Sequence, residues 1–185
     1  MSSTRYRPAC LLATAVLLAG CAQQTEIPKL HNQVVELKQK LSTLTNQATA
    51  LEQQNQLNQN STRGVYLLPA ADSPAKLQSS IGELNIALTQ IRAEAGGAQA
   101  VLQLQASPGH TLPPFHAVVE WGQLDSASGK PLSAGSLSQP IAVGDTPPAS
   151  SERQVELRFN GVTPAQLGYV RLHSIMPRDA QSPAP

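Results

Sequence analysis

Two cysteines and four histidines are the residue types in this chain best suited to chemistry. Cys10 lies inside an apolar run that extends from Ala9 to Ala19, and Cys21 follows the run after Gly20. If the run is removed, Cys21 becomes the first residue and the one remaining thiol. A single thiol cannot form an internal disulfide, so the count points instead to covalent modification of Cys21.

The segment before Cys21 has the layout of a targeting sequence. Arg5 and Arg7 precede an apolar run of about eleven residues, which is the length of a signal-peptide core. A membrane-spanning helix would need about 20 apolar residues. The order of basic start, apolar run and Leu18-Ala19-Gly20-Cys21 resembles a bacterial lipobox. That resemblance implies removal of residues 1–20 by cleavage between Gly20 and Cys21. The alternative is a core cysteine in an ordinary secretory signal.

The lipoprotein resemblance also implies a location. The thiol of Cys21 would carry acyl chains such as palmitate, each contributing about 0.8 kcal/mol per buried methylene group, and two or more chains anchor a protein stably. The expected partner is therefore a membrane, reached through the N-terminal lipid. In lipoproteins generally, Asp after the cysteine favours the inner membrane. Ala22 at that position implies the outer membrane, with the protein facing the periplasm.

The composition of the chain limits the size, the charge and the kind of core that the part after residue 20 can have. Removing residues 1–20 leaves about 165 residues, which is enough for one modest domain and an extension. It also leaves 11 basic against 12 acidic residues, because Arg5 and Arg7 are lost from the 13 basic ones. No basic patch indicates a nucleic-acid partner. Aromatic residues are 3% and prolines number 15, which predicts an aliphatic core and many turns.

A heptad pattern predicts a coiled-coil helix over 27–59, after a lipidated N-terminus and spacer at 21–26. Such a helix would be about 50 Å long and could hold the rest of the chain away from a bilayer. Pro28 suits the first turn of the helix, where a missing N–H costs little. The predicted apolar seam, at heptad positions a and d, consists of Ile27, Leu30, Val34, Leu37, Leu41, Leu44, Ala48 and Leu51.

The seam allows two interpretations. Largely β-branched residues at a and Leu at d favour a parallel dimer, in which Asn55 at a further a position would help to fix the register. The chain would then form a homo-oligomer through this helix. The flanking positions are mostly uncharged, so ion pairs between helices would specify little. The alternative is a single amphipathic helix that lies against the domain or the membrane surface.

The remainder predicts a mainly β fold: an immunoglobulin-like antiparallel β-sandwich over 65–177, preceded by the N-terminal heptad helix. Residues 60–64 are expected to be a linker and 178–185 a disordered tail. The best single strand signal is the alternation of Phe115, Ala117, Val119 and Trp121 with His116, Val118 and Glu120. A bulge is expected near Gln90. The other expected strands lie near 65–68, 84–88, 99–105, 137–143, 155–159 and 168–175.

Several segments together resemble the YajI-like family of enterobacterial lipoproteins, over essentially the whole chain after the lipobox. The resemblance implies the order lipobox, helix and β domain, and it carries no catalytic residue with it. The segments that carry it are Gly64-Val65-Tyr66-Leu67-Leu68-Pro69, Ile81-Gly82-Glu83-Leu84, Val119-Glu120-Trp121-Gly122-Gln123, Gln166-Leu167-Gly168-Tyr169-Val170-Arg171 and Glu52-Gln53-Gln54-Asn55-Gln56-Leu57-Asn58.

Catalytic and metal-binding patterns are weak. No two histidines have metal-ligand spacing beside a carboxylate or cysteine, so we predict no metal site and no cofactor; a zinc site could arise only through folding. There is no Gly-x-Ser-x-Gly elbow and no phosphate loop. Glu120, Glu156 and Arg158 are expected on solvated strand faces, with a cross-strand charge pair as the alternative. Trp121 and Phe159 are expected in the core.

These observations favour a non-enzymatic envelope interaction or scaffold protein, anchored in the membrane, whose protein partner the sequence does not identify. The alternative is a β-sandwich module that binds lipid, glycan or peptide, for which an apolar concavity would be evidence. An enzyme would need two polar residues with perturbed pKa values in one pocket. We therefore predict that the chain is not an enzyme.

Overall fold

The structure, a computed structural model, describes residues 26–61, 63–144 and 151–178. The predicted signal segment, Gly20, Cys21 and the predicted tail beyond Arg178 lie outside these residues. The chain divides into two compact units, one ending at Thr45 and one starting at Asn46. The described elements are α2 (Glu26–Gln59), β1 (Val65–Leu67), a 3₁₀ turn η1 (Pro69–Ala71), β2 (Ala75–Ser79), β3 (Gly82–Glu94), β4 (Gly97–Ala106), β5 (Phe115–Gly122), β6 (Leu137–Val143), β7 (Glu152–Asn160) and β8 (Tyr169–Pro177).

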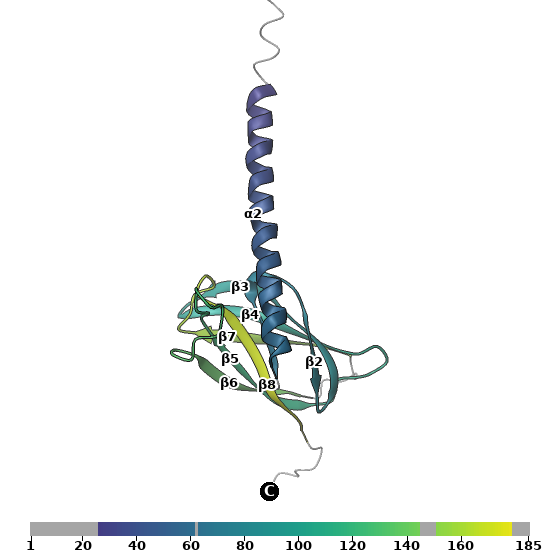
Figure 1. Cartoon of the computed structure of the whole chain (residues 1–185). Helices are drawn as coiled ribbons and strands as arrows, with labels where there is room; N and C mark the ends of the chain where they lie inside the picture. The colour runs from purple at the N-terminus through teal and green to yellow at the C-terminus, as the bar shows by residue number, and fades with distance from the viewer. Residues whose placement is uncertain (1–25, 62, 145–150, 179–185) are drawn as a thin grey trace, which may run out of the picture. The chain divides into compact units, whose positions relative to one another are not determined.

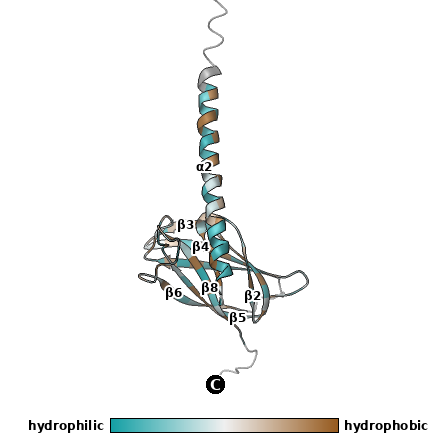
Figure 2. Ribbon diagram, viewed as in Figure 1, coloured by the Kyte–Doolittle hydropathy of each residue, from teal (hydrophilic) through white to brown (hydrophobic). Residues whose placement is uncertain are grey.

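The helix predicted from the heptads is confirmed as α2, which spans 34 residues. In the first unit it is stabilised along its own axis by an ion pair of 2.6 Å between Lys40 and Glu36, one turn apart. The Thr43 hydroxyl also donates to the Gln39 carbonyl oxygen at 3.0 Å. Apolar residues, brown in Figure 2, recur along this part of α2. No helix among the described residues is both long and apolar enough to cross a bilayer.

The second unit begins inside α2, not at the predicted linker. α2 ends at Gln59 and β1 starts at Val65, on either side of the predicted linker, while the compact second unit extends back into α2 as far as Asn46. The reason is that the last turns of α2 pack on the β domain and bury apolar surface there. The small cluster they form contains Ala50, Leu68, Ala71 and Tyr169, with Leu51, Leu57, Tyr66 and Leu124 at its margin.

Two amide side chains fasten these turns to the chain around β1. Gln54 is fully buried; its Oε1 accepts from the Leu68 N–H at 2.8 Å and its Nε2 donates to the Ser73 carbonyl oxygen at 3.3 Å. Asn58 exchanges two hydrogen bonds with the backbone of Tyr66, at 2.7 and 2.9 Å. These bonds satisfy backbone groups that a neighbouring strand would otherwise satisfy.

We expect Gln54→Ala to destabilise the chain by about 1–3 kcal/mol, because the buried Leu68 N–H loses its acceptor. Urea denaturation followed by circular dichroism measures the loss. Gln56→Ala serves as the control, because Gln56 is exposed and lies two residues further along the same helix. It should change stability by less than about 0.5 kcal/mol. Equal effects of the two substitutions would contradict this role of Gln54.

The β domain is a two-layer antiparallel sandwich, which confirms the predicted immunoglobulin-like class (Figure 1). One sheet has the strand order β1-β8-β5-β6 and the other β2-β3-β4-β7. The predicted strand near 137–143, which contains Pro140, is the edge strand β6, where a missing N–H is tolerated. Strand β2 was not predicted, although its residues alternate between buried and exposed positions.

Two backbone irregularities shape the sheets. The bulge expected near Gln90 is confirmed: Gln90 has φ 53° and the pairing of β3 with β4 shifts between Thr89 and Arg92. A second one, not predicted, lies in β8 at Ser174, which also has φ 53°. There the pairing of β5 with β8 shifts between His116 and Val118. Such bulges redirect the side chains that follow.

The core between the sheets is mostly aliphatic, as expected from the composition. Trp121 and Phe159 are both buried and meet edge to face, with ring centroids 5.5 Å apart, so their predicted core role is confirmed. Leu84, Ile86 and Leu102 are among the fully buried side chains around them.

Candidate functional site

The predicted seam is exposed in the first unit. Leu30, Val34, Leu37, Leu41 and Leu44 keep between 47% and 67% of their surface accessible. The side chain of Ile27 lies outside the described residues. Because a continuous row of large apolar side chains on one helix face is usually buried by a partner surface, this stripe is a candidate interaction site.

The seam changes character in the second unit. Ala48 and Asn55, at predicted a positions, are exposed, whereas Leu51 is half-buried on the β domain. The positions that pack most deeply, Ala50 and Gln54, are not seam positions. The predicted seam is therefore exposed to solvent as far as Leu44. From Leu51 onward, part of it packs on the β domain.

A polar row crosses the outer face of the first sheet. Tyr66 on β1 pairs in register with Arg171 on β8, and Arg171 pairs with Glu120 on β5. Because side chains alternate along a strand, Tyr169 and His173 lie on the same face, two residues to either side of Arg171. Strands β1, β5 and β8, which are distant in sequence, thus bring together five polar or aromatic side chains: Tyr66, Glu120, Tyr169, Arg171 and His173.

Glu120 is the centre of this polar row. One oxygen, Oε1, accepts from the Tyr169 hydroxyl at 2.8 Å. The other, Oε2, lies 3.5 Å from the Arg171 guanidinium and 3.8 Å from His173 Nε2. Arg171 also donates to the Arg63 carbonyl oxygen at 2.8 Å and stacks over the Tyr66 ring, 5.0 Å from its centroid. Its Nε is buried and has no hydrogen-bond partner among the described residues.

The row shifts two pKa values. Burial, together with the hydrogen bond to Glu120 and the charge of that carboxylate, raises the pKa of Tyr169 well above its usual 10.0. Burial and the neighbouring Arg171 cation lower the pKa of His173 below 6.5, while the Glu120 carboxylate opposes this shift. Since both Glu120 oxygens are already engaged, the arrangement is better suited to holding charges in place than to taking up a substrate proton.

We expect Tyr169→Phe to cost about 1.5 kcal/mol at pH 7, the usual contribution of a hydrogen bond to a charged group. The folded state keeps the Tyr169 proton where an unfolded tyrosine would lose it. Stability from this group is therefore complete below pH 10 and is lost as pH rises further. Between pH 8 and pH 11, the free energy of unfolding, measured from denaturation curves, should fall more in the parent chain than in Tyr169→Phe. Identical slopes would contradict the assignment.

A wide hollow of about 720 Å³ opens beside the polar row. Tyr66, Glu120 and Arg171 form one side of it, and Lys130 and Leu132 of the β5–β6 connection form the other. The lining mixes apolar, aromatic and charged groups. It is therefore not the apolar concavity that a lipid-binding module would need.

The remaining residues considered from the sequence are dispersed. His31, His110 and His116 are exposed. Glu156 and Arg158 lie on β7 in the other sheet, where they pair with Arg92 and Glu94 at 3.7 and 3.6 Å, so they form no charge pair with Glu120. Among the described residues no three His, Cys, Asp or Glu side chains converge on a possible metal position.

Sequence reasoning missed the polar row itself. The alternation of Tyr169, Arg171 and His173 around buried Val170 and Leu172 was a usable signal, because it places all three on the outer face. What it could not indicate is that β8 lies between β1 and β5.

The fold and these sites define a class of protein: a helix with an exposed apolar stripe followed by a β-sandwich. Residues 21–181 match the family described as "Protein of unknown function (DUF3251)", and the chain belongs to this family. It is 35% identical over 167 residues to the uncharacterized lipoprotein YajI of Escherichia coli (strain K12), covering 90% of this chain and 93% of that one. The resemblance to YajI-like lipoproteins is thereby confirmed.

Solved structures that resemble the fold include those of two lipoproteins. The solution NMR structure of E. coli YajI has a TM-score of 0.67 and 34% identity, over 75% of this chain and 82% of that one. The Salmonella enterica trimeric lipoprotein SadB has a TM-score of 0.51 and 18% identity, over 93% of this chain and 98% of that one. The second likeness concerns the fold alone.

Proposed function

We propose that this chain is a non-enzymatic, lipid-anchored envelope protein that associates with other copies of itself through the first part of α2. Acylation of Cys21 holds it at the periplasmic face of the outer membrane. The relatives at 34–35% identity are lipoproteins, which supports the anchor. The observation that carries the self-association is the exposed stripe from Leu30 to Leu44.

Energetics favour a second copy as the occupant of this stripe. Burying a Leu or Val side chain contributes about 1.5–3 kcal/mol, so five of them offset much of the entropic cost of association. Heptad spacing lets two or three parallel helices interlock, whereas a flat surface would not require that spacing. Anchors in one leaflet orient all copies in parallel and raise their effective concentration.

The number of copies is the quantity to measure. The β-branched a and leucine d positions favour a dimer. SadB is described as trimeric, which makes a trimer the other state to test. Sedimentation equilibrium of the chain purified from membranes in detergent should give a mass two or three times that of one chain. A single-chain mass at all concentrations would refute self-association.

A ligand-binding role is the second candidate. The hollow beside the polar row and a smaller cavity at the edge of β8 support it, since both lie in the β domain and both are lined by polar groups. This role is compatible with self-association because the two use different surfaces.

A further inference from the structure

Strand β8 has an unpaired edge. On the side of β1 it is paired at three residues, Val170 to Leu172, because β1 is only three residues long. From His173 to Pro177, β8 has no strand partner on that side among the described residues. An open strand edge presents N–H and C=O groups that an extended backbone can pair with.

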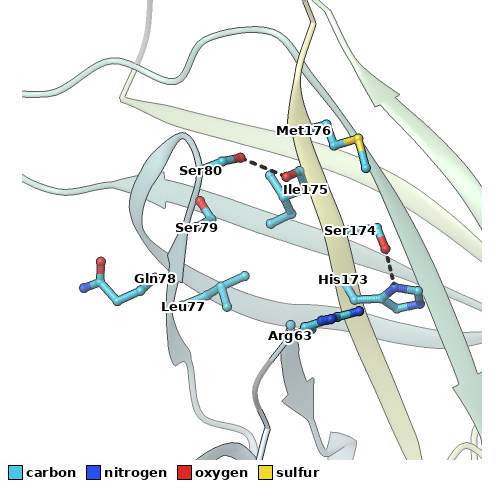
Figure 3. A pocket seen from close by; sticks show the side chains of 10 residues that line it. Arg63, Leu77, Gln78, Ser79, Ser80, His173, Ser174, Ile175 and Met176 are labelled. Carbon is cyan, nitrogen blue, oxygen red and sulfur yellow. Dashed lines mark hydrogen bonds between the residues drawn. The ribbon is translucent and has the colours of Figure 1, made fainter.

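A cavity of about 320 Å³ borders this edge (Figure 3). Its far wall is the end of β2 and the turn that follows, with Leu77 and Ser80. The Ser80 hydroxyl donates to the Ile175 carbonyl oxygen at 2.9 Å, so this backbone acceptor of β8 faces the cavity and already has one donor. Met176, at 62% exposure, adds an apolar contact at the rim. Main-chain and apolar groups together suit an extended peptide.

Arg63 supplies a cation at one end of the cavity. The Arg63 and His173 side chains are both among the residues that line the cavity (Figure 3). The backbone at Arg63 is held in place, since its carbonyl oxygen accepts from Arg171 at 2.8 Å. The ten residues that line the cavity include no Asp or Glu. A carboxylate is therefore the complementary group at this end.

The direction of a bound strand follows from β1. Strand β1 is antiparallel to β8, so a peptide continuing its line would run from Pro177 toward His173 and finish beside Arg63. The chain itself enters β1 at Gly64, which lies so close to the Leu172 carbonyl that a Cβ would collide with it. A bound peptide must therefore end or turn away there. A parallel peptide would instead place its ammonium group against Arg63.

We propose that this cavity binds the free C-terminus of a partner protein. About four extended residues lie along β8 from Ser174 to Pro177 and bond to its free backbone groups, where Pro177 offers only its carbonyl oxygen. Their terminal carboxylate binds Arg63. The ligand class is an extended peptide with a free α-carboxylate, and its recognition is independent of the helix stripe.

The test uses the full chain in detergent and a library of random hexapeptides with free C-terminal carboxylates, read by fluorescence polarisation. The tightest peptides should lose about tenfold in affinity when made as C-terminal amides, and about tenfold with Arg63→Ala. Arg63→Lys should restore part of the loss. Lys130→Ala, which removes a cation from the other hollow, is the matched control and should leave affinity unchanged.

Amide resonances locate the bound peptide. In ¹⁵N spectra, the tightest peptide should shift Ser174, Ile175 and Met176 more than residues of β6. The proposal is overturned if no library member binds more tightly than about 1 mM, if amides and carboxylates bind equally, or if Lys130→Ala weakens binding and Arg63→Ala does not. The proposal of a partner protein is also overturned if the only peptide that binds is one with the sequence of this chain's own last residues.

Discussion

Replacing Cys21 by serine should abolish incorporation of labelled palmitate and release the chain from the membrane fraction. A serine at the lipobox position cannot accept the acyl groups on sulfur. Each buried methylene group of a lipid contributes about 0.8 kcal/mol, so losing several chains removes essentially all membrane affinity. Fractionation of cells and detection of the chain in outer-membrane, inner-membrane and soluble fractions measure the effect.

Two further variants make this result specific to Cys21. Cys10→Ser, inside the apolar run, should leave both labelling and sedimentation unchanged. Because the run at Ala9–Ala19 could itself hold an uncleaved chain at a bilayer, the Cys21→Ser variant should also be made behind a cleavable leader from a soluble secreted protein. Outer-membrane sedimentation of that unlabelled, cleaved chain would refute the lipid anchor.

The double substitution Leu37→Gln with Leu44→Gln should reduce the chain to a monomer. Both side chains are more than 60% exposed and both occupy d positions, so in an oligomer they would lie at the centre of the seam. Their loss should weaken association by at least about 100-fold, on the usual contribution of buried leucine. Sedimentation equilibrium across a 100-fold range of concentration, about 1–100 µM, measures the shift.

Val35→Gln is the matched control for the seam. Val35 is also exposed, at 41%, but lies beside the stripe at position b of the heptad. It should leave the mass unchanged if association follows the heptad. An equal effect of Val35→Gln would mean that the helix associates through general apolarity, and an unchanged mass in the double variant would exclude the seam altogether.

Local sequence patterns predicted most elements of the fold. Strand β5 was predictable because Phe115, Ala117, Val119 and Trp121, all four buried, alternate with His116, Val118 and Glu120, which are less buried. The helix was predictable from a strict heptad run, and the bulge at Gln90 from an apolar residue out of phase by one. In each case the signal is carried by neighbours within a few residues.

Elements whose stability is not local were missed. Strand β2 contributes two exposed polar residues and a serine, and it is held by its pairing with β3 rather than by its own composition. The packing of Ala50 and Gln54 on the β domain was missed for the same reason. Their side chains are short or polar, and nothing near them in sequence reveals that Leu68 needs an acceptor.

The candidate sites also fall into two groups: those formed by one segment of the chain and those formed by several strands. The proposed acylation site at Cys21 and the stripe from Leu30 to Leu44 could be predicted from the sequence, because each depends on residue order along one segment. The Tyr66–Arg171–Glu120 row and the cavity at the edge of β8 depend on which strands lie side by side. That choice is made by burial of apolar side chains from both sheets in one core, so only the tertiary structure decided it.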